Sequence, residues 1–131
     1  RPLQPCSTAG MATTGYTRSG MCERHRGDRG NHHICLDIAR VDDDGKNFCQ
    51  LTGQANWCAA PSHDCVDASG PCTRQNWCVC QWAFADILDT IDCADLHIKC
   101  DATSSKALEA YRKSPKYEKA LACLQKQCPS K

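Results

Sequence analysis

The sequence predicts a small, disulfide-rich α+β domain with a short β-sheet, two or three helices and long stapled loops. Three observations predict this class: 13 of the 131 residues are cysteine, hydrophobic residues reach only 41%, and short strand-like and helix-like apolar patterns both occur. The length suits a single domain over residues 1–131. Cysteine at this density is typical of scaffolds in which disulfides supplement a thin apolar core. The longest apolar stretch, residues 82–88, contains Asp86 and is far shorter than the ~20 residues of a membrane helix.

The first half of the chain predicts one strand among loops. Residues 1–31 are rich in Gly, Thr, Ser and Arg without an apolar period, so we expect ordered loop. In His33–Ile38 apolar residues alternate, which predicts a short strand. Residues 42–45, Asp-Asp-Asp-Gly, predict a turn. Residues 52–76 hold two glycines, two prolines and three cysteines, and predict a stapled loop.

The second half predicts three helices and a second strand. Apolar residues recur at helical spacing in each helical segment, and hydroxyl residues precede two of them as candidate N-caps. A proline directly after a hydroxyl residue favours the first helical position. The predicted elements are a helix over Phe84–Ile91 between Cys80 and Cys93, a strand over His97–Cys100, a helix over Thr103–Lys113 capped by Thr103 or Ser104, and a helix that begins at Ser114 and Pro115 and ends before Pro129.

The cysteines predict an oxidising compartment. No C-x-x-C spacing occurs, which disfavours zinc knuckles, and disulfides at this density are rare in the cytosol. We therefore expect a secreted protein whose signal peptide has been removed, or alternatively a protein of an organelle lumen. An odd count leaves one thiol unpaired beside about six disulfides, or joined to a second copy in a homodimer. The cysteines are Cys6, Cys22, Cys35, Cys49, Cys58, Cys65, Cys72, Cys78, Cys80, Cys93, Cys100, Cys123 and Cys128.

Charge is divided unevenly although the net charge is only +1. Residues 1–31 carry +3, residues 32–103 carry −7 and residues 104–131 carry +5. Near-neutrality over the whole chain gives no general attraction to nucleic acid. We expect the basic ends to pack beside the acidic middle; a basic face for an acidic protein partner is the alternative.

Two groups of side chains are candidate binding residues. The first is a basic, histidine-rich patch near the N-terminus. Its arginines would repel a metal cation and its histidines lack a helical i,i+4 pair, so we expect a surface patch without metal or cofactor. The second is a pair of tryptophans in two Asn-Trp-Cys tripeptides, which are either core residues or an exposed aromatic platform. The candidates are Arg24, His25, Arg26, Arg29, His32, His33, Trp57 and Trp77.

Motifs for catalysis are missing from the sequence. Neither G-x-S-x-G nor H-E-x-x-H occurs. An EF-hand calcium loop centred on the acidic turn would begin at Arg40 and end at Leu51, where a bidentate Glu belongs, so the turn does not fit a calcium loop. We expect no enzyme. Cys78 and Cys80 form a C-x-C spacing that could be a reducible redox pair, but we expect both to serve structural disulfides.

Five short segments of the chain together form a recognisable pattern. They are Pro2–Ser7, Thr14–Cys22, Gly30–Cys35, Trp77–Cys80 and Ala102–Leu108. In this order they resemble the motifs of a family of small uncharacterised proteins, best known from bacteria as domain of unknown function 2237. The resemblance spans roughly residues 2 to 110, which leaves 111–131 as a basic helix and tail. It implies a compact α+β fold and no particular activity.

One departure from the family pattern bears on the odd cysteine. Met21 stands where the family has the first of two adjacent cysteines, and Ser104 and Ser105 replace a His and a Glu. Eight cysteines lie outside the family pattern and can close as four bridges. We therefore expect the unpaired thiol among the other five, with Cys22 or a former partner of position 21 favoured. The five are Cys6, Cys22, Cys35, Cys78 and Cys80.

These observations favour a secreted, non-enzymatic binding or effector protein, such as a toxin-like ligand, a pheromone or a matrix component. The motivation is the cysteine density, the missing catalytic motifs and the loop-rich surface. The first alternative is an accessory subunit of a larger lumenal or extracellular assembly. The second is a redox-active thiol protein that uses Cys78 and Cys80.

Overall fold

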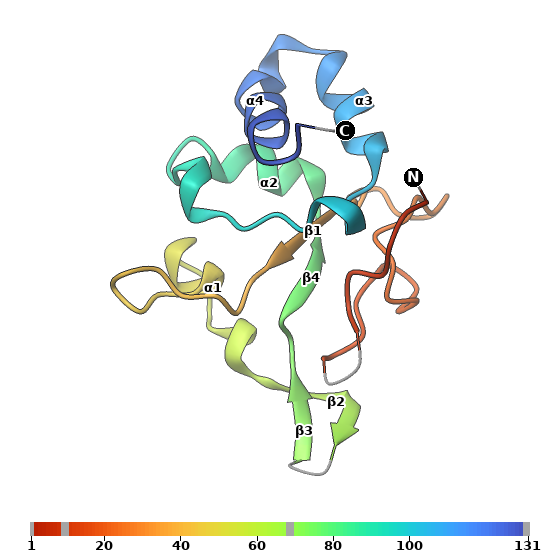
Figure 1. The fold of residues 1–131 in the computed structure, drawn as a ribbon, viewed down its shortest axis with the longest axis vertical. Coiled ribbons are helices and arrows are strands. Elements are labelled where there is room, and N and C mark those ends of the chain that lie inside the picture. The colour runs from red at the N-terminus through yellow and green to blue at the C-terminus, as the bar shows by residue number, and fades with distance from the viewer. Residues whose placement is uncertain (1, 9–10, 68–69, 130–131) are drawn as a thin grey trace.

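The computed structural model describes the backbone of residues 2–8, 11–67 and 70–129, and their side chains except those of 62–67 and 70–71. A short central sheet separates three helices at one end of the molecule from a β-hairpin at the other, while the N-terminal loop lies along one side (Figure 1). This arrangement confirms the predicted disulfide-rich α+β class. Within the described chain, no helix has the length and apolar character needed to cross a membrane.

The central sheet consists of β1 (Ile34–Asp37) and β4 (Asn76–Val79), which pair antiparallel with Cys35 opposite Cys78. Because strand side chains alternate between faces, Ile34 and Leu36 face the helices while Cys35 faces the N-terminal loop. The predicted strand over 33–38 is therefore confirmed, with each of its ends one residue shorter.

Two buried threonines protect the outer edges of this sheet. Thr14 accepts a hydrogen bond from the Cys78 backbone N–H at 2.9 Å, and Thr103 accepts one from the Cys35 N–H at 3.1 Å. Both hydroxyl residues are almost fully buried. A two-stranded sheet leaves the outward N–H groups of both strands without ladder partners, so these side chains replace the missing strands.

The prediction of a loop over residues 52–76 was wrong, because part of this range forms a second sheet. β2 (Pro61–Asp67) and β3 (Gly70–Thr73) form an antiparallel hairpin. The prolines argued against strands, but both strands are edges of a two-stranded sheet, where proline is tolerated: Pro61 is the first residue of β2 and Pro71 the second of β3. Two short helical segments were also not predicted: α1 (Phe48–Leu51) and a 3₁₀ turn over Trp57–Ala59.

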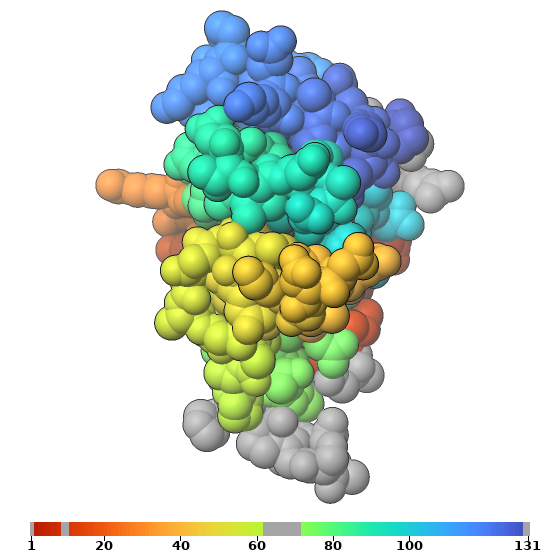
Figure 2. Space-filling view, turned by 90° about the vertical axis from the view of Figure 1, so that its left-hand side faces the viewer, coloured from red at the N-terminus to blue at the C-terminus, as the bar shows by residue number. Residues whose placement is uncertain are grey.

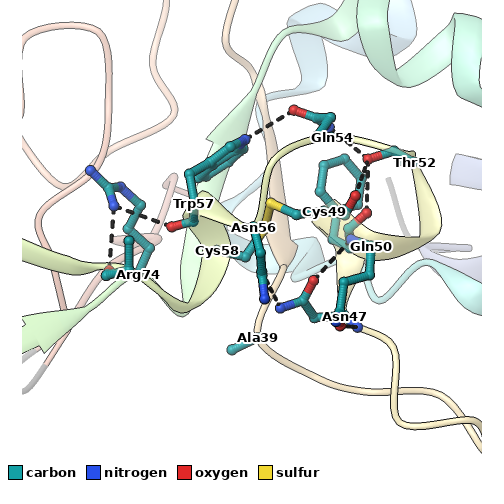
Figure 3. The surroundings of a disulfide bond; sticks show 12 residues. Ala39, Asn47, Cys49, Gln50, Thr52, Gln54, Asn56, Trp57, Cys58 and Arg74 are labelled. Carbon is teal, nitrogen blue, oxygen red and sulfur yellow. Dashed lines mark hydrogen bonds between the residues drawn. A yellow bond between two sulfur atoms is a disulfide. The ribbon is translucent and has the colours of Figure 1, made fainter.

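The helix α1 is too short to show an apolar period, and its capping explains why it forms. The Asn47 side chain accepts from the Gln50 N–H at 3.1 Å, and the Gln50 side chain accepts from the Asn47 N–H at 2.9 Å. This capping box satisfies two backbone donors at the helix start. The Cys49–Cys58 disulfide then joins α1 to the following 3₁₀ turn (Figure 3).

The three predicted helices are confirmed with shifted ends. α2 (Gln81–Ile87) begins directly after Cys80 and ends before the predicted Ile91. α3 (Ser105–Arg112) has Ser104 as its N-cap, and its side chain accepts from the Lys106 N–H. α4 (Glu118–Gln127) follows a 3₁₀ turn over Pro115–Tyr117 that Ser114 caps.

The predicted strand over 97–100 is replaced by a single β-bridge between Leu36 and Ile98. Two backbone hydrogen bonds flank the bridge, from Asp37 N–H to His97 O and from Lys99 N–H to Cys35 O. The chain then turns into a 3₁₀ segment over Cys100–Ala102, so the pairing with β1 cannot extend.

Two apolar clusters lie on opposite faces of the central sheet. The main core packs β1 against the three helices and includes Tyr111, Phe84 and Leu124 as fully buried side chains. The second cluster is mainly sulfur: the Cys6–Cys35 and Cys22–Cys78 disulfides with Ala102. Disulfides therefore replace apolar side chains where the N-terminal loop covers the sheet.

Two further disulfides attach α4 to the chain before α3. Cys93 is bonded to Cys123, and Cys100 is bonded to Cys128. Gln127 adds polar contacts at the same place, since its side-chain amide donates to Cys93 O and Leu96 O, both at 2.8 Å. The C-terminal helix is held by covalent bonds as well as by its buried face.

We predict that Thr14→Val destabilises the fold. Valine keeps the shape of threonine but leaves the Cys78 N–H buried without an acceptor, which costs about 1–3 kcal/mol in free energy of unfolding. Denaturant unfolding measures this loss. The exposed Thr17→Val is the matched control, expected to stay within about 0.5 kcal/mol of the wild type; an equal effect of both substitutions would contradict the edge role of Thr14.

Candidate functional site

The N-terminal loop and β4 enclose a cavity of about 280 Å³, which we call the Tyr16 cavity. A turn in which the Arg18 N–H donates to Gly15 O shapes one wall. Position 15 requires glycine, because its φ is 101° and because a Cβ there would lie 2.7 Å from Met21 O. The lining residues are Gly15, Tyr16, Arg18, His32, Trp77 and Cys78.

Tyr16 connects the cavity to the predicted histidine-rich segment. Its ring is 48% exposed and lies 4.7 Å from the ring of His25 and 6.5 Å from that of His32, measured between centroids. Its hydroxyl donates to Gly27 O at 3.0 Å. The Tyr16 side chain therefore holds residues 25–32 against the turn at residues 15–18.

His32 is oriented by a carboxylate. Its Nδ1 lies 2.7 Å from Asp28 Oδ1, and its backbone N–H donates to Asp28 Oδ2 at 2.8 Å. Burial alone raises the pKa of Asp28, but the hydrogen bonds and charge of His32 outweigh it, so the pKa lies below its usual value. Asp28 is thus a buried, ionised carboxylate that contacts His32, and it forms no ion pair with an arginine of the described residues.

Four side chains from three separate segments form an alternating stack beside the cavity. The guanidinium of Arg18 lies 5.1 Å from the Trp77 ring centre, and that of Arg74 lies 5.4 Å from Trp77 and 5.9 Å from Trp57. The two indole centroids are 6.3 Å apart. The three distances from guanidinium to indole are within the range of cation–π attraction. We call these four residues the Arg–Trp stack.

Local hydrogen bonds hold the stack in place. Arg74 Nη1 donates to Trp57 O at 3.3 Å, and Trp57 Nε1 donates to Gln54 Oε1 at 2.9 Å (Figure 3). Both indoles are partly exposed and pack against the main core. The two tryptophans of the Asn-Trp-Cys tripeptides are therefore both core-contacting and accessible, and each is followed by a disulfide cysteine, Cys58 or Cys78.

The structure brings most of the predicted binding residues to one side. Arg24, Arg26 and Arg29 are exposed in the segment that packs on Tyr16, and in the described chain no ion pair engages them. Trp82 fixes this segment to α2 by donating its indole N–H to Arg29 O at 3.2 Å. Tyr16, Arg18 and Arg74 were not predicted; the first two lie in the Thr14–Cys22 motif, which was the available signal.

His33 does not belong to this surface, so its prediction as a binding residue is corrected. It is only 3% exposed, and its Nδ1 donates to Gln81 Oε1 at 2.7 Å, while its Nε2 is buried without a hydrogen-bond partner. Burial lowers its pKa, and the bond to Gln81 only partly offsets this. The hydroxyl of Tyr111 donates to Gln81 O, which fixes the backbone of the same residue in the core.

The proposed Cys78–Cys80 redox pair is not present. Cys78 is bonded to Cys22, and Cys80 is the free cysteine among the described side chains. Cys80 is one of the five cysteines to which the odd thiol was assigned. Of the two favoured alternatives, Cys22 is excluded by its bond to Cys78, and a former partner of position 21 stays open. Cys72 is also disulfide-bonded, and the side chain of Cys65 lies outside the described part.

Cys80 lies beside His32 across Gly30. A Cβ at position 30 would be 2.8 Å from His32 Cε1 and 3.3 Å from Cys80 Sγ. Glycine therefore permits the close approach of ring and thiol. The only potential metal-ligand cluster in the described residues is Cys6, Cys22 and Cys78, whose sulfurs are all in disulfides and offer no thiolate.

A second hollow of about 520 Å³ lies between the end of α2 and α4. Its apolar wall includes Leu88 and Ile91, and Lys119 pairs with Asp89 at 3.3 Å. No residue predicted as a binding residue lines it, and its charged groups include both signs.

Comparison with known sequences identifies the class of the chain. Residues 1–116 match the sequence model of a family described as an uncharacterized protein conserved in bacteria (DUF2237). The chain therefore belongs to this family, which confirms the resemblance found from the motifs. No curated protein matches the chain significantly.

We predict that His33 makes stability depend on pH. Because its pKa is lowered in the fold from 6.5, the unfolded chain takes up a proton at a higher pH than the folded chain. The stability is complete above about pH 6.5 and is lost as pH falls toward the lowered pKa. His33→Asn, which keeps a donor toward Gln81, should flatten the decline in unfolding free energy, whereas the exposed His25→Asn should leave it unchanged. Identical pH profiles for both variants would contradict this.

We also predict selective alkylation of Cys80 in the native protein. Iodoacetamide should modify Cys80 without reductant, as peptide mass spectrometry can determine. Gly30→Ala should slow the reaction several-fold, because its methyl group would contact the thiol. His25→Ala, a change in the same segment without a contact to Cys80, should react at the wild-type rate. A disulfide-bonded Cys80 in the native protein would overturn the assignment.

Proposed function

We propose that this chain is a secreted, non-enzymatic binding protein that holds its ligand at the Tyr16 cavity. The observation that carries the proposal is the cavity itself, which has exposed aromatic and arginine walls on a covalently fixed framework. Its volume of about 280 Å³ is at the small end of ligand sites, which are ~300–1,000 Å³. Such a cavity suits one ring or one side-chain-sized group of a ligand.

The chemistry of the lining supports binding rather than catalysis. The sulfur of Cys78 is in a disulfide, and the hydroxyl of Tyr16 donates to a backbone carbonyl. Asp28 holds Nδ1 of His32 and leaves its Nε2 as a base, but the lining residues supply no nucleophile for it, and the free Cys80 does not line the cavity. What they do offer is a cation, two aromatic faces and an imidazole.

The disulfides support a location outside the cytosol. Five described bridges join segments up to 56 residues apart in sequence. Such bonds persist in oxidising compartments. We propose that the protein is secreted. Among the roles predicted from the sequence, we favour that of a matrix component.

A fragment titration tests the ligand site. Small carboxylates, small sulfates and neutral monosaccharides are added to ¹⁵N-labelled protein, and amide shifts are followed by NMR. We expect shifts concentrated at residues 15–18, 32 and 77. Tyr16→Ala should weaken the strongest fragment by about tenfold, or 1.4 kcal/mol.

Val41→Ala is the control for this substitution, since Val41 is, with Tyr16, the large exposed hydrophobic residue among the described side chains, and it does not line the cavity. It should retain wild-type affinity. Shifts confined to the hollow between α2 and α4, or no shift with any fragment, would overturn the proposed site.

A further inference from the structure

The Tyr16 cavity is one end of a longer surface. The Arg–Trp stack continues from the cavity wall through Trp77 to Arg74 and Trp57, and Tyr16 with His25 extends it in the other direction. Flat aromatic faces and cationic groups therefore alternate along it. This surface is built from residues 16–32, 57 and 74–77, which the fold brings together from distant parts of the sequence.

The segment that borders the cavity, residues 23–32, carries a net positive charge, because its three arginines outnumber Glu23 and Asp28. Arg24, Arg26 and Arg29 are exposed, and none of them is in an ion pair with another described residue. The orange N-terminal segment projects from the side of the molecule (Figure 2). The acidic residues here are Asp28, which is buried against His32, and Glu23, which accepts from Ser19 at 3.2 Å.

We propose that this surface binds a sulfated polysaccharide; the inference rests on the proposed function and names its ligand class. The apolar face of a sugar ring packs on Tyr16 or Trp77, and the sulfates lie against Arg18 and the three exposed arginines. Guanidinium groups bind tetrahedral oxyanions through paired N–H donors, as they do phosphate. The aromatic side chains thus stack on the sugar rings, and the arginines pair with the sulfates.

The compartment favours a sulfated sugar over nucleic acid, whereas charge does not separate the two, because both ligands are polyanions. Disulfides persist in secreted and extracellular proteins, and sulfated polysaccharides are polymers of the extracellular space. Single-stranded DNA is therefore a competing ligand in the test.

The experiment titrates size-defined heparin oligosaccharides into the full chain by calorimetry. The same oligosaccharides after chemical desulfation, and single-stranded DNA of similar charge, are the comparison probes. We expect the sulfated form to bind at least about tenfold more tightly than either comparison probe at physiological salt, and to weaken as salt rises.

A charge-matched pair of variants identifies the surface. The triple substitution Arg24→Ser, Arg26→Ser and Arg29→Ser should reduce affinity by about tenfold or more. The control removes the same number of charges from exposed residues at the helical end of the molecule and should stay within about twofold. It comprises Arg112→Ser, Lys113→Ser and Lys126→Ser.

Equal losses in both triple variants would overturn the proposed surface, because binding would then follow net charge alone. Equal or tighter binding of DNA would overturn the ligand class. The fragment titration separates this failure from that of the proposed function: if fragments shift the cavity residues but sulfated oligosaccharides do not bind, only the ligand class is wrong. If neither binds, the ligand site itself is rejected.

Discussion

The rest of the structure depends on two neighbouring disulfides at the middle of the central sheet. Cys35 and Cys78 are directly opposite each other on β1 and β4, and each is bonded to the N-terminal loop, through Cys6 and Cys22. Each bridge of this kind contributes about 2–4 kcal/mol by restricting the unfolded chain. Because the loop contains no helix or strand in its described residues, these bonds supply the rigidity that secondary structure would otherwise provide.

The same bonds explain how a loop can form a binding cavity. Tyr16 and Arg18 lie between the two anchored cysteines, so they are held beside Trp77 on the sheet. A ligand would then meet side chains that are already ordered, and little conformational entropy would be lost on binding. Cys78 is used in the bridge to Cys22, and Cys80, two residues further on, is free and lies beside His32.

Local sequence signals predicted the elements that are determined by local physics. The strand around Cys35 and the helices after Ser104 and Ser114 follow from side-chain periodicity and capping, which act over a few residues. The β2–β3 hairpin and the bridge at Ile98 were mispredicted, because prolines are tolerated on edge strands and because a single bridge depends on the neighbour available in space.

The amino-acid pattern was sufficient for the fold class, the family, the dependence on disulfides and the group of five cysteines that contains Cys80, the free cysteine among the described side chains. Only the tertiary structure decided which cysteines pair, that His33 is buried, and that Trp57, Trp77 and two arginines stack beside Tyr16. The physical reason is that periodicity and capping are short-range, whereas a disulfide partner or a stacking partner is fixed by distances between segments that lie far apart in the chain.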